Sequence, residues 1–103
     1  MSQDSNAGEG AQRRRASGKK TVARRVSDAR QQFEELTGIE VESVSGVEKL
    51  DGGWTVTLEA LELRRVPDTV SLLATYTVEI DTVGELVGYR RRSRYTRGRS
   101  DSR

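Results

Sequence analysis

The sequence predicts a small α+β domain, in which one N-terminal amphipathic helix packs on a four-stranded antiparallel meander sheet. Three observations predict this fold. Apolar residues between about residues 21 and 36 recur at helical spacing, four later segments resemble strands, and the connections between the segments are short. Short connections make successive strands antiparallel neighbours, and a sheet with an apolar face needs a helix to cover it.

Composition divides the chain into three parts. Residues 1–20 are rich in Ser, Gly, Gln and Arg and lack hydrophobic periodicity, which predicts a disordered basic tail. Residues 21–97 are expected to form the single α+β domain, and residues 98–103 a frayed C-terminal tail. Only 33% of the 103 residues are apolar and 5% are aromatic, so the core is expected to be small and its stability to depend on a partner.

The helix is predicted from about Thr21 to Leu36. Its apolar residues are four, three, four and three positions apart, which places them on one stripe: Val22, Val26, Ala29, Phe33 and Leu36. Gly38 suits the left-handed position at which helices end. The stripe is interpreted as the face that covers the sheet, and a helix that binds a partner is the alternative.

The first two strands are predicted on either side of a glycine-rich turn at residues 51–53. The first strand covers residues 39–50, and a change of phase predicts a bulge at Gly46. The second strand begins at Trp54, and its apolar residues change parity between Trp54, Val56 and Leu58 on the one hand and Leu61 and Leu63 on the other. One extra residue would keep both sets on the core face, so a second bulge is predicted near Ala60.

Pro67 separates the second strand from the third, because its ring fixes φ and its nitrogen cannot donate a hydrogen bond. Residues 72–80 alternate most regularly and predict the third strand. A short hairpin loop with Gly84 at a positive φ leads into the last strand, residues 86–95. The order is therefore tail, helix, four strands and tail.

The net charge of +2 conceals a segregation of charge. Residues 1–20 carry five Lys or Arg and two acids, and residues 89–103 carry seven Arg and one Asp. Residues 21–88 carry six basic and thirteen acidic residues. The molecule is therefore an acidic body with basic ends, an arrangement that suits contacts with other macromolecules.

The residues that are missing exclude several kinds of chemistry. The chain has no cysteine and no histidine, which removes disulfides, thiolate catalysis and the commonest general base and metal ligands. No catalytic set, cofactor site or metal site is predicted, and the protein is not expected to be an enzyme. No apolar run approaches the roughly 18 residues of a membrane span, and the N-terminus is too polar for a secretory signal, so a cytoplasmic protein is expected.

The arginine-rich last strand and the loop at Pro67 are the candidate binding surface. Arginine binds carboxylates and phosphates in a bidentate manner, and tyrosine can stack on bases. The candidate residues are Arg65, Pro67, Asp68, Tyr89, Arg90, Arg92, Arg94, Tyr95 and Arg97. The surface is interpreted as a protein-docking face, with nucleic-acid binding and protection of the sheet edge as alternatives.

Two carboxylates, Glu59 and Glu62, lie three positions apart in the second strand. They could form an acid/base pair, but an ion-pair belt with nearby arginines is the favoured interpretation. Some of the arginines 90, 92 and 94 are accordingly expected to pair with Glu59, Glu62 or Glu79.

From about Val26 to Arg97 the chain resembles the gas vesicle protein O family. The resemblance rests on the order and spacing of three groups of residues: Trp54, Val56, Glu59, Glu62 and Arg65-Val66-Pro67-Asp68-Thr69; Leu73-Ala74, Tyr76, Val78, Asp81 and Gly84; Gly88-Tyr89-Arg90, Arg94-Tyr95 and Arg97. It implies an accessory role in the formation of gas vesicles, the hollow protein shells that give cells buoyancy, without enzymatic activity.

The partners that the resemblance implies are other gas vesicle proteins, with the shell protein itself as a further candidate. It implies an association with gas vesicles, and no site residues of the family are established well enough to be assigned here. The residues themselves predict a cytoplasmic protein with no membrane partner and no cofactor. A homodimer stays open. A nucleic-acid-binding or regulatory module and a structural component of the shell are the competing hypotheses.

Overall fold

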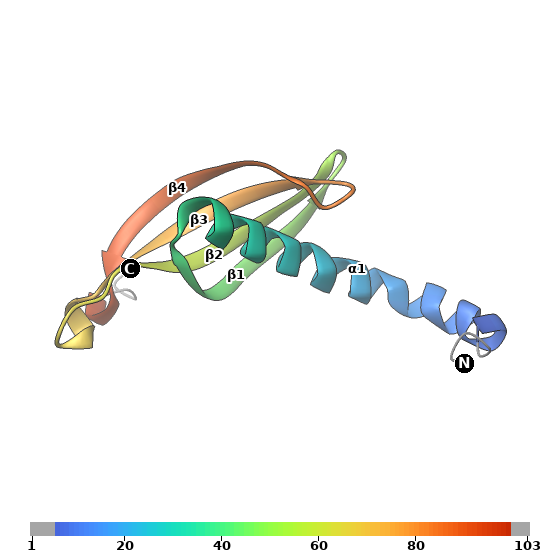
Figure 1. Ribbon diagram of the computed structural model, residues 1–103, viewed down its shortest axis with the longest axis horizontal. Helices are drawn as coiled ribbons and strands as arrows, with labels where there is room; N and C mark the ends of the chain where they lie inside the picture. The colour runs from blue at the N-terminus through green and yellow to red at the C-terminus, as the bar shows by residue number, and fades with distance from the viewer. Residues whose placement is uncertain (1–5, 100–103) are drawn as a thin grey trace.

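Four antiparallel strands form one sheet in the order β1-β2-β3-β4, and a long helix lies across one face of it (Figure 1). The computed structural model describes the secondary structure of residues 6–99 and the side chains of residues 21–98. The predicted α+β meander is confirmed. Its elements are α1 (Asn6–Thr37), β1 (Glu40–Leu50), β2 (Gly53–Leu63), the 3-10 turn η2 (Asp68–Val70), β3 (Leu72–Asp81), β4 (Leu86–Thr96) and the 3-10 turn η3 (Arg97–Arg99).

The second half of α1 covers the sheet with the predicted stripe. Ala29 and Phe33 are fully buried, and Val26 packs at the margin of the same core. Their partners in the sheet include Val56, Leu58, Ala60, Ala74, Tyr76, Val78 and Ile80. Leu36 is a correction to the predicted stripe: it is 62% exposed, because the helix ends one residue later and its last turn leads into the connection to β1.

Gly38 ends the helix as predicted. Its φ is +74°, and its amide donates a hydrogen bond of 2.8 Å to the carbonyl of Glu34. A glycine adopts this left-handed conformation without the steric cost that a Cβ would add.

The first half of α1 differs from the predicted boundary, since the helix begins at Asn6 and not near Thr21. Figure 1 shows this half extending away from the sheet, so no strand packs against its backbone. Residues 1–5 and 100–103 lie outside the described part, and so do the side chains of residues 6–20. The disordered tail over residues 1–20 therefore stays a prediction, and of the predicted C-terminal tail only residues 98 and 99 are described, in η3.

The bulges place the side chains on the two faces of the sheet. The register between β1 and β2 shifts at Val44/Gly46, where a bulge was predicted, and also at Val41/Ser43. The bulge predicted near Ala60 lies instead at Glu62, where the register between β2 and β3 shifts. Ala60 keeps the phase of Trp54 because its small side chain is buried opposite Ala74.

The displaced bulge also corrects the predicted positions of two leucines. Leu61 is buried on the face away from α1, where it lies opposite Leu73, and Leu63 is 45% exposed. We call the face away from α1 the open face; it carries Thr55, Glu59, Leu61, Leu73, Thr75, Thr77 and Glu79. No described helix covers it (Figure 1).

Among the described residues, no helix has both the length and the apolar composition that crossing a membrane requires.

Candidate partner-binding surface

Two bulges in β4 distribute its arginines over both faces of the sheet. The register between β3 and β4 shifts at Thr75/Tyr76 and at Glu79/Ile80, which leaves Arg92 and Val87 as the extra residues. Arg91 is therefore opposite Tyr76 and Arg94 opposite Ala74, on the face that α1 covers, whereas Arg90 is opposite Thr77 on the open face. Simple alternation along β4 would have placed Arg90, Arg92 and Arg94 together.

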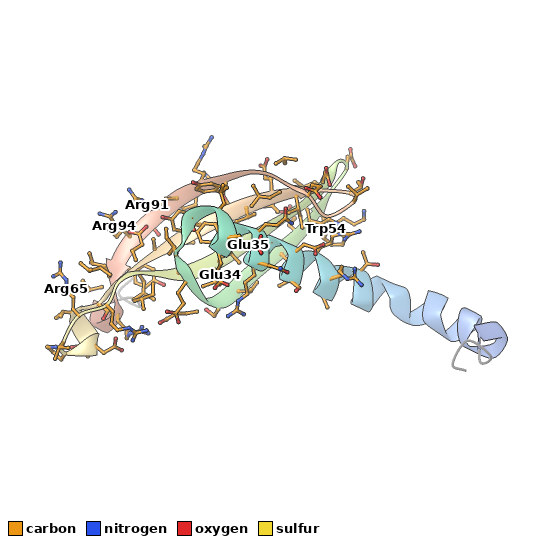
Figure 2. The ribbon with its side chains drawn as sticks, in the orientation of Figure 1. Glu34, Glu35, Trp54, Arg65, Arg91 and Arg94 are labelled. Atoms are coloured by element: carbon orange, nitrogen blue, oxygen red, sulfur yellow. The ribbon has the colours of Figure 1, made fainter. Side chains whose placement is uncertain are left out.

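Glu62 is the centre of an ion-pair cluster on the helix side. Its side chain is only 11% exposed and lies 2.9 Å from Nε of Arg94 and 3.2 Å from Nη1 of Arg91. The hydroxyl of Tyr76 also donates a hydrogen bond to it. The expected pairing of a β4 arginine with Glu62 is thus confirmed for Arg94, and Arg91 joins it because the bulge at Arg92 changes the phase of the strand. Figure 2 shows the side chains of Arg91 and Arg94 beside each other on β4.

This cluster moves the pKa values of its acidic members in opposite directions. Burial alone would raise the pKa of Glu62, but the hydrogen bonds from Tyr76 and Arg91 and the charge of Arg94 outweigh it and hold the pKa below 4.5. Burial and the hydrogen bond to Glu62 raise the pKa of the Tyr76 hydroxyl. Glu62 therefore stays ionised and stabilises the arginines beside it.

Glu59 binds a different set of partners, all of them hydroxyls of the open face. It accepts hydrogen bonds of 2.7 Å from Ser45, Thr75 and Tyr95. Burial, followed by the bond to Glu59, raises the pKa of Tyr95 to about 12. Because Glu59 and Glu62 serve separate networks, the structure does not bring them together as an acid/base pair.

The Pro67 loop is held by the buried hydroxyl of Ser71. Ser71 Oγ accepts a hydrogen bond from the Arg65 amide at 2.9 Å and donates one to the Asp68 carboxylate at 2.9 Å. The peptide bond before Pro67 is cis, and Val66 is 96% exposed at the tip. Figure 2 shows the side chain of Arg65 at this end of the molecule, beyond Arg94 and Arg91.

Arg97 joins this loop to the far edge of the sheet. Its guanidinium binds Glu42 of β1 at 3.0 and 2.6 Å, and its Nε lies 2.7 Å from Asp68 Oδ2 at an angle that makes an ion contact without a hydrogen bond. The hydrogen bonds to Glu42 raise the pKa of Arg97 further. Sequence reasoning missed Glu42, since no local signal connects it with a residue beyond the end of β4.

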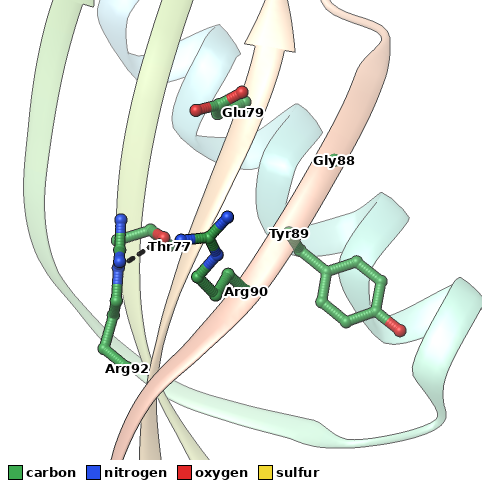
Figure 3. Close-up of a pocket in the computed structure, with 6 residues that line it drawn as sticks. All are labelled: Thr77, Glu79, Gly88, Tyr89, Arg90 and Arg92. Atoms are coloured by element: carbon green, nitrogen blue, oxygen red, sulfur yellow. Dashed lines mark hydrogen bonds between the residues drawn. The ribbon is translucent and has the colours of Figure 1, made fainter.

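The other candidate residues divide between the two faces. Tyr89 is 45% exposed and packs edge-on against Phe33 at 5.6 Å between ring centroids, which places it on the helix side. Arg90 and Arg92 are exposed on the open face, and Nε of Arg92 donates to Thr77 Oγ1 at 3.2 Å (Figure 3). Neither belongs to an ion pair among the described side chains. They border a hollow of about 290 Å³ whose walls include Gly88 and Glu79.

The predicted candidate residues therefore have different surroundings. Arg94, Tyr95, Arg97 and Asp68 are engaged within the protein, whereas Arg65, Arg90 and Arg92 are exposed. The structure does not bring them together into one surface: Arg90 and Arg92 share the open face, and Arg65 belongs to the loop at the end of the sheet.

Comparisons with known proteins agree on one family. The model of the family described as "Gas vesicle synthesis protein GvpO" matches residues 8–101. The chain is 64% identical over 70 residues to gas vesicle protein O of a Streptomyces species, an alignment that covers 68% of this chain and 55% of that protein. It is also 31% identical over 78 residues to gas vesicle protein O1 of Halobacterium salinarum, covering 76% of this chain and 66% of that protein.

A third relative, gas vesicle protein O of Haloferax mediterranei, is 35% identical over 71 residues, which cover 68% of this chain and 51% of that protein. The chain thus spans about half to two thirds of the length of these curated relatives. No solved structure matches the chain. Because the family match extends from the first half of α1 through β4, the chain belongs to the gas vesicle synthesis protein GvpO family.

Proposed function

We propose that this protein is an accessory factor in gas vesicle formation, acts through protein–protein contacts and is not an enzyme. Its family membership supports the gas vesicle role, and the observation that supports a docking role is the uncovered sheet face with exposed Arg90 and Arg92. The partners would be other gas vesicle accessory proteins, or the shell protein, in the cytoplasm where vesicles form.

The charge distribution supports a protein partner over nucleic acid. A nucleic-acid surface gathers cations in a continuous patch. Here, Arg91 and Arg94 pair with Glu62, and Arg97 pairs with Glu42, so Arg90 and Arg92 are the arginines of β4 that form no ion pair among the described side chains.

Deletion of the gene in its host, with vesicles scored by electron microscopy, tests the assembly role. We expect vesicles to be lost, and to return with the wild-type gene. A variant with Arg90→Glu and Arg92→Glu should fail to restore them, because it reverses the charge of the exposed arginines without touching an ion pair of the described residues. Arg24→Glu, an exposed change on α1, is the matched control and should restore them.

Normal vesicles in the deletion strain would contradict the assembly role. Full rescue by the variant with both charges reversed would show that Arg90 and Arg92 are not required for assembly. Two further results would favour the competing functions. Retention of the protein on a polyanion column, with a steep dependence on salt, would indicate nucleic-acid binding. Stoichiometric recovery with floated, washed vesicles indicates a component of the shell.

A further inference from the structure

Two hollows adjoin on the open face, toward the β1–β2 hairpin. The basic hollow, of about 290 Å³, is bordered by Thr77, Gly88, Arg90 and Arg92. The apolar hollow, of about 200 Å³, is bordered by Leu50 and Val87 together with the hairpin glycines. Glu79 borders both, so the two hollows adjoin at this residue, and we call the pair the depression.

The basic hollow has the chemistry of a carboxylate site. Arg90 and Arg92 present two planar guanidinium groups, which match a carboxylate by paired hydrogen bonds. One nitrogen of Arg92 is held by Thr77, and this bond orients the group over the sheet (Figure 3). Gly88 adds no side chain, and no heavy atom lies within 4 Å of the position that its Cβ would take, so a ligand atom can approach the strand closely.

The apolar hollow offers contacts of a different kind. Leu50 is 43% exposed and Val87 is 62% exposed. Val87 is the extra residue of the first bulge in β4, which turns it out of the regular alternation of the strand. One apolar side chain seated between Leu50 and Val87 would remove both from water, a gain of about 25 cal/mol per Å² of apolar surface that is covered.

Glu79 makes the two ends of the depression differ in the charge that they favour. Glu79 borders both hollows, and its negative charge disfavours an acidic group at the apolar end, while the arginines favour one at the other end. A repulsive group beside an attractive one determines specificity as well as affinity. The depression is therefore suited to a ligand with an apolar group at one end and carboxylates at the other.

From this arrangement we infer that the open face binds an extended, acidic segment of another protein, with an apolar side chain between Leu50 and Val87 and a carboxylate at Arg90 and Arg92. This inference rests on the proposed function in that the segment would belong to an assembly partner. It adds the chemistry of that partner and a second, apolar half of the docking surface.

The test uses the full chain labelled with ¹⁵N and a capped peptide of leucine, serine and three glutamates, followed by NMR at low salt. We expect the shifts to concentrate at the amides of Gly52 and Gly88 and at the Nε groups of Arg90 and Arg92. The Arg90→Gln/Arg92→Gln variant should bind about fivefold more weakly, because two exposed ion pairs of about 0.5 kcal/mol each together contribute about 1 kcal/mol. The Arg24→Gln variant is the matched control and should bind as the wild type does.

Two further variants separate this surface from general attraction of charge. Glu79→Gln should bind the peptide more tightly by about twofold, since it removes the repulsive carboxylate. Val87→Ser should weaken binding of the leucine peptide but not of a peptide in which serine replaces that leucine. A surface that recognises only charge would bind the leucine and serine peptides alike, and Val87→Ser would change neither affinity.

Equal binding by the wild type and the Arg90→Gln/Arg92→Gln variant would overturn the inference, and so would shifts confined to residues 13–20. Tighter binding of an oligothymidylate than of the peptide would show that the site is for phosphates. The deletion strain distinguishes the two proposals. Loss of vesicles in that strain, without peptide binding by the purified protein, would support the assembly role and contradict the peptide site. Peptide binding together with normal vesicles would support the peptide site and contradict the assembly role.

Discussion

At Glu62, one carboxylate receives hydrogen bonds from three side chains, those of Tyr76, Arg91 and Arg94. Burial of an acid is costly unless such partners compensate the lost hydration. In turn, the Glu62 carboxylate is the counter-charge of two arginines at the edge of the sheet. This pairing makes an arginine-rich strand compatible with a folded domain.

Replacement of Glu62 by Gln should destabilise the protein by about 1–3 kcal/mol, because it removes a largely buried charge and replaces one of the two acceptor oxygens by an NH2 group that faces the arginine donors. Urea unfolding measures this change. Glu40→Gln is the matched control: Glu40 is well exposed, lies 3.6 Å from an equally exposed Arg64, and should contribute less than about 0.5 kcal/mol. Equal effects of the two changes would contradict the role of the cluster.

Glu62 should also make the free energy of unfolding depend on pH in the acidic range. Its folded pKa is below 4.5, so its stabilisation is complete above the unfolded value and is lost as pH falls through the folded one. Unfolding free energy followed from pH 6 downward should decline less in Glu62→Gln than in the wild type. Parallel curves would exclude Glu62 as the source.

Tyr95 should titrate at about pH 12 in the folded protein. An unfolded tyrosine loses its proton near pH 10, so the stabilisation from Tyr95 is complete below pH 10 and is lost as pH rises toward 12. Ultraviolet difference titration at 295 nm, compared with Tyr95→Phe, measures the value. A titration of this residue near pH 10 would contradict the bond to Glu59.

Among the elements, α1 and the β3–β4 hairpin are joined by side chains of the helix that bind the hairpin backbone. Gln32 donates to the carbonyl of Gly84 at 2.7 Å and accepts from the amide of Leu86 at 2.9 Å. Arg25 donates to the carbonyl of Thr82 at 3.0 Å. These bonds determine where the helix crosses the sheet, which leaves the opposite face open.

Gly84→Ala should destabilise this junction by about 1–3 kcal/mol. The φ of Gly84 is +94°, and an added Cβ would clash with the carboxylate of Asp28 and lie 2.8 Å from Nη1 of Arg25. Thermal or urea unfolding measures the loss. Gly52→Ala, where nothing lies within 4 Å of the added Cβ, should be nearly neutral, and equal losses at both glycines would contradict the argument.

The first half of α1 should exchange its amide hydrogens much faster than the second half. It includes Gly8, Gly10 and Gly18 and a run of like charges, and an unpacked helix of this length is marginal in water. Hydrogen exchange followed by mass spectrometry compares residues 6–20 with residues 22–36. Equal protection in the two halves would refute the predicted disordered tail.

Across the whole molecule, Arg97 connects the two edges of the sheet, since it follows β4 and binds Glu42 in β1. Its backbone amide also donates to the carbonyl of Ser71 at 2.9 Å. The Pro67 loop, the end of β4 and the start of β1 are thereby held together at one end of the sheet.

Arg97→Gln should loosen both sides of this connection together. We expect faster amide exchange at Val70 and Ser71 in the loop and also in β1 near Glu42, because the same guanidinium binds Asp68 and Glu42. Arg65→Gln, an exposed change in the same loop, should alter neither. An effect of Arg97→Gln limited to the loop would show that the contact with β1 is incidental.

The sequence alone was sufficient for the order and kind of the elements, because those depend on local patterns. The spacing of Ala29 and Phe33 indicated the buried helix face, and Gly38 and Gly84 occupy the positive-φ positions expected of them. The fold class follows from these patterns together with the short connections.

Tertiary structure alone decided which face each arginine occupies. A bulge changes the face of the sheet on which every later residue of the strand lies, and the position of the bulge depends on packing between strands. Ala60 fits opposite Ala74, so the bulge in β2 lies at Glu62. The bulge at Arg92 places Arg91 on the same face as Glu62. The partner of Arg97 lies 55 residues away and on the other edge of the sheet, where no local pattern could indicate it. Local sequence determines the elements, and the register between strands determines which charges are neutralised and which remain exposed.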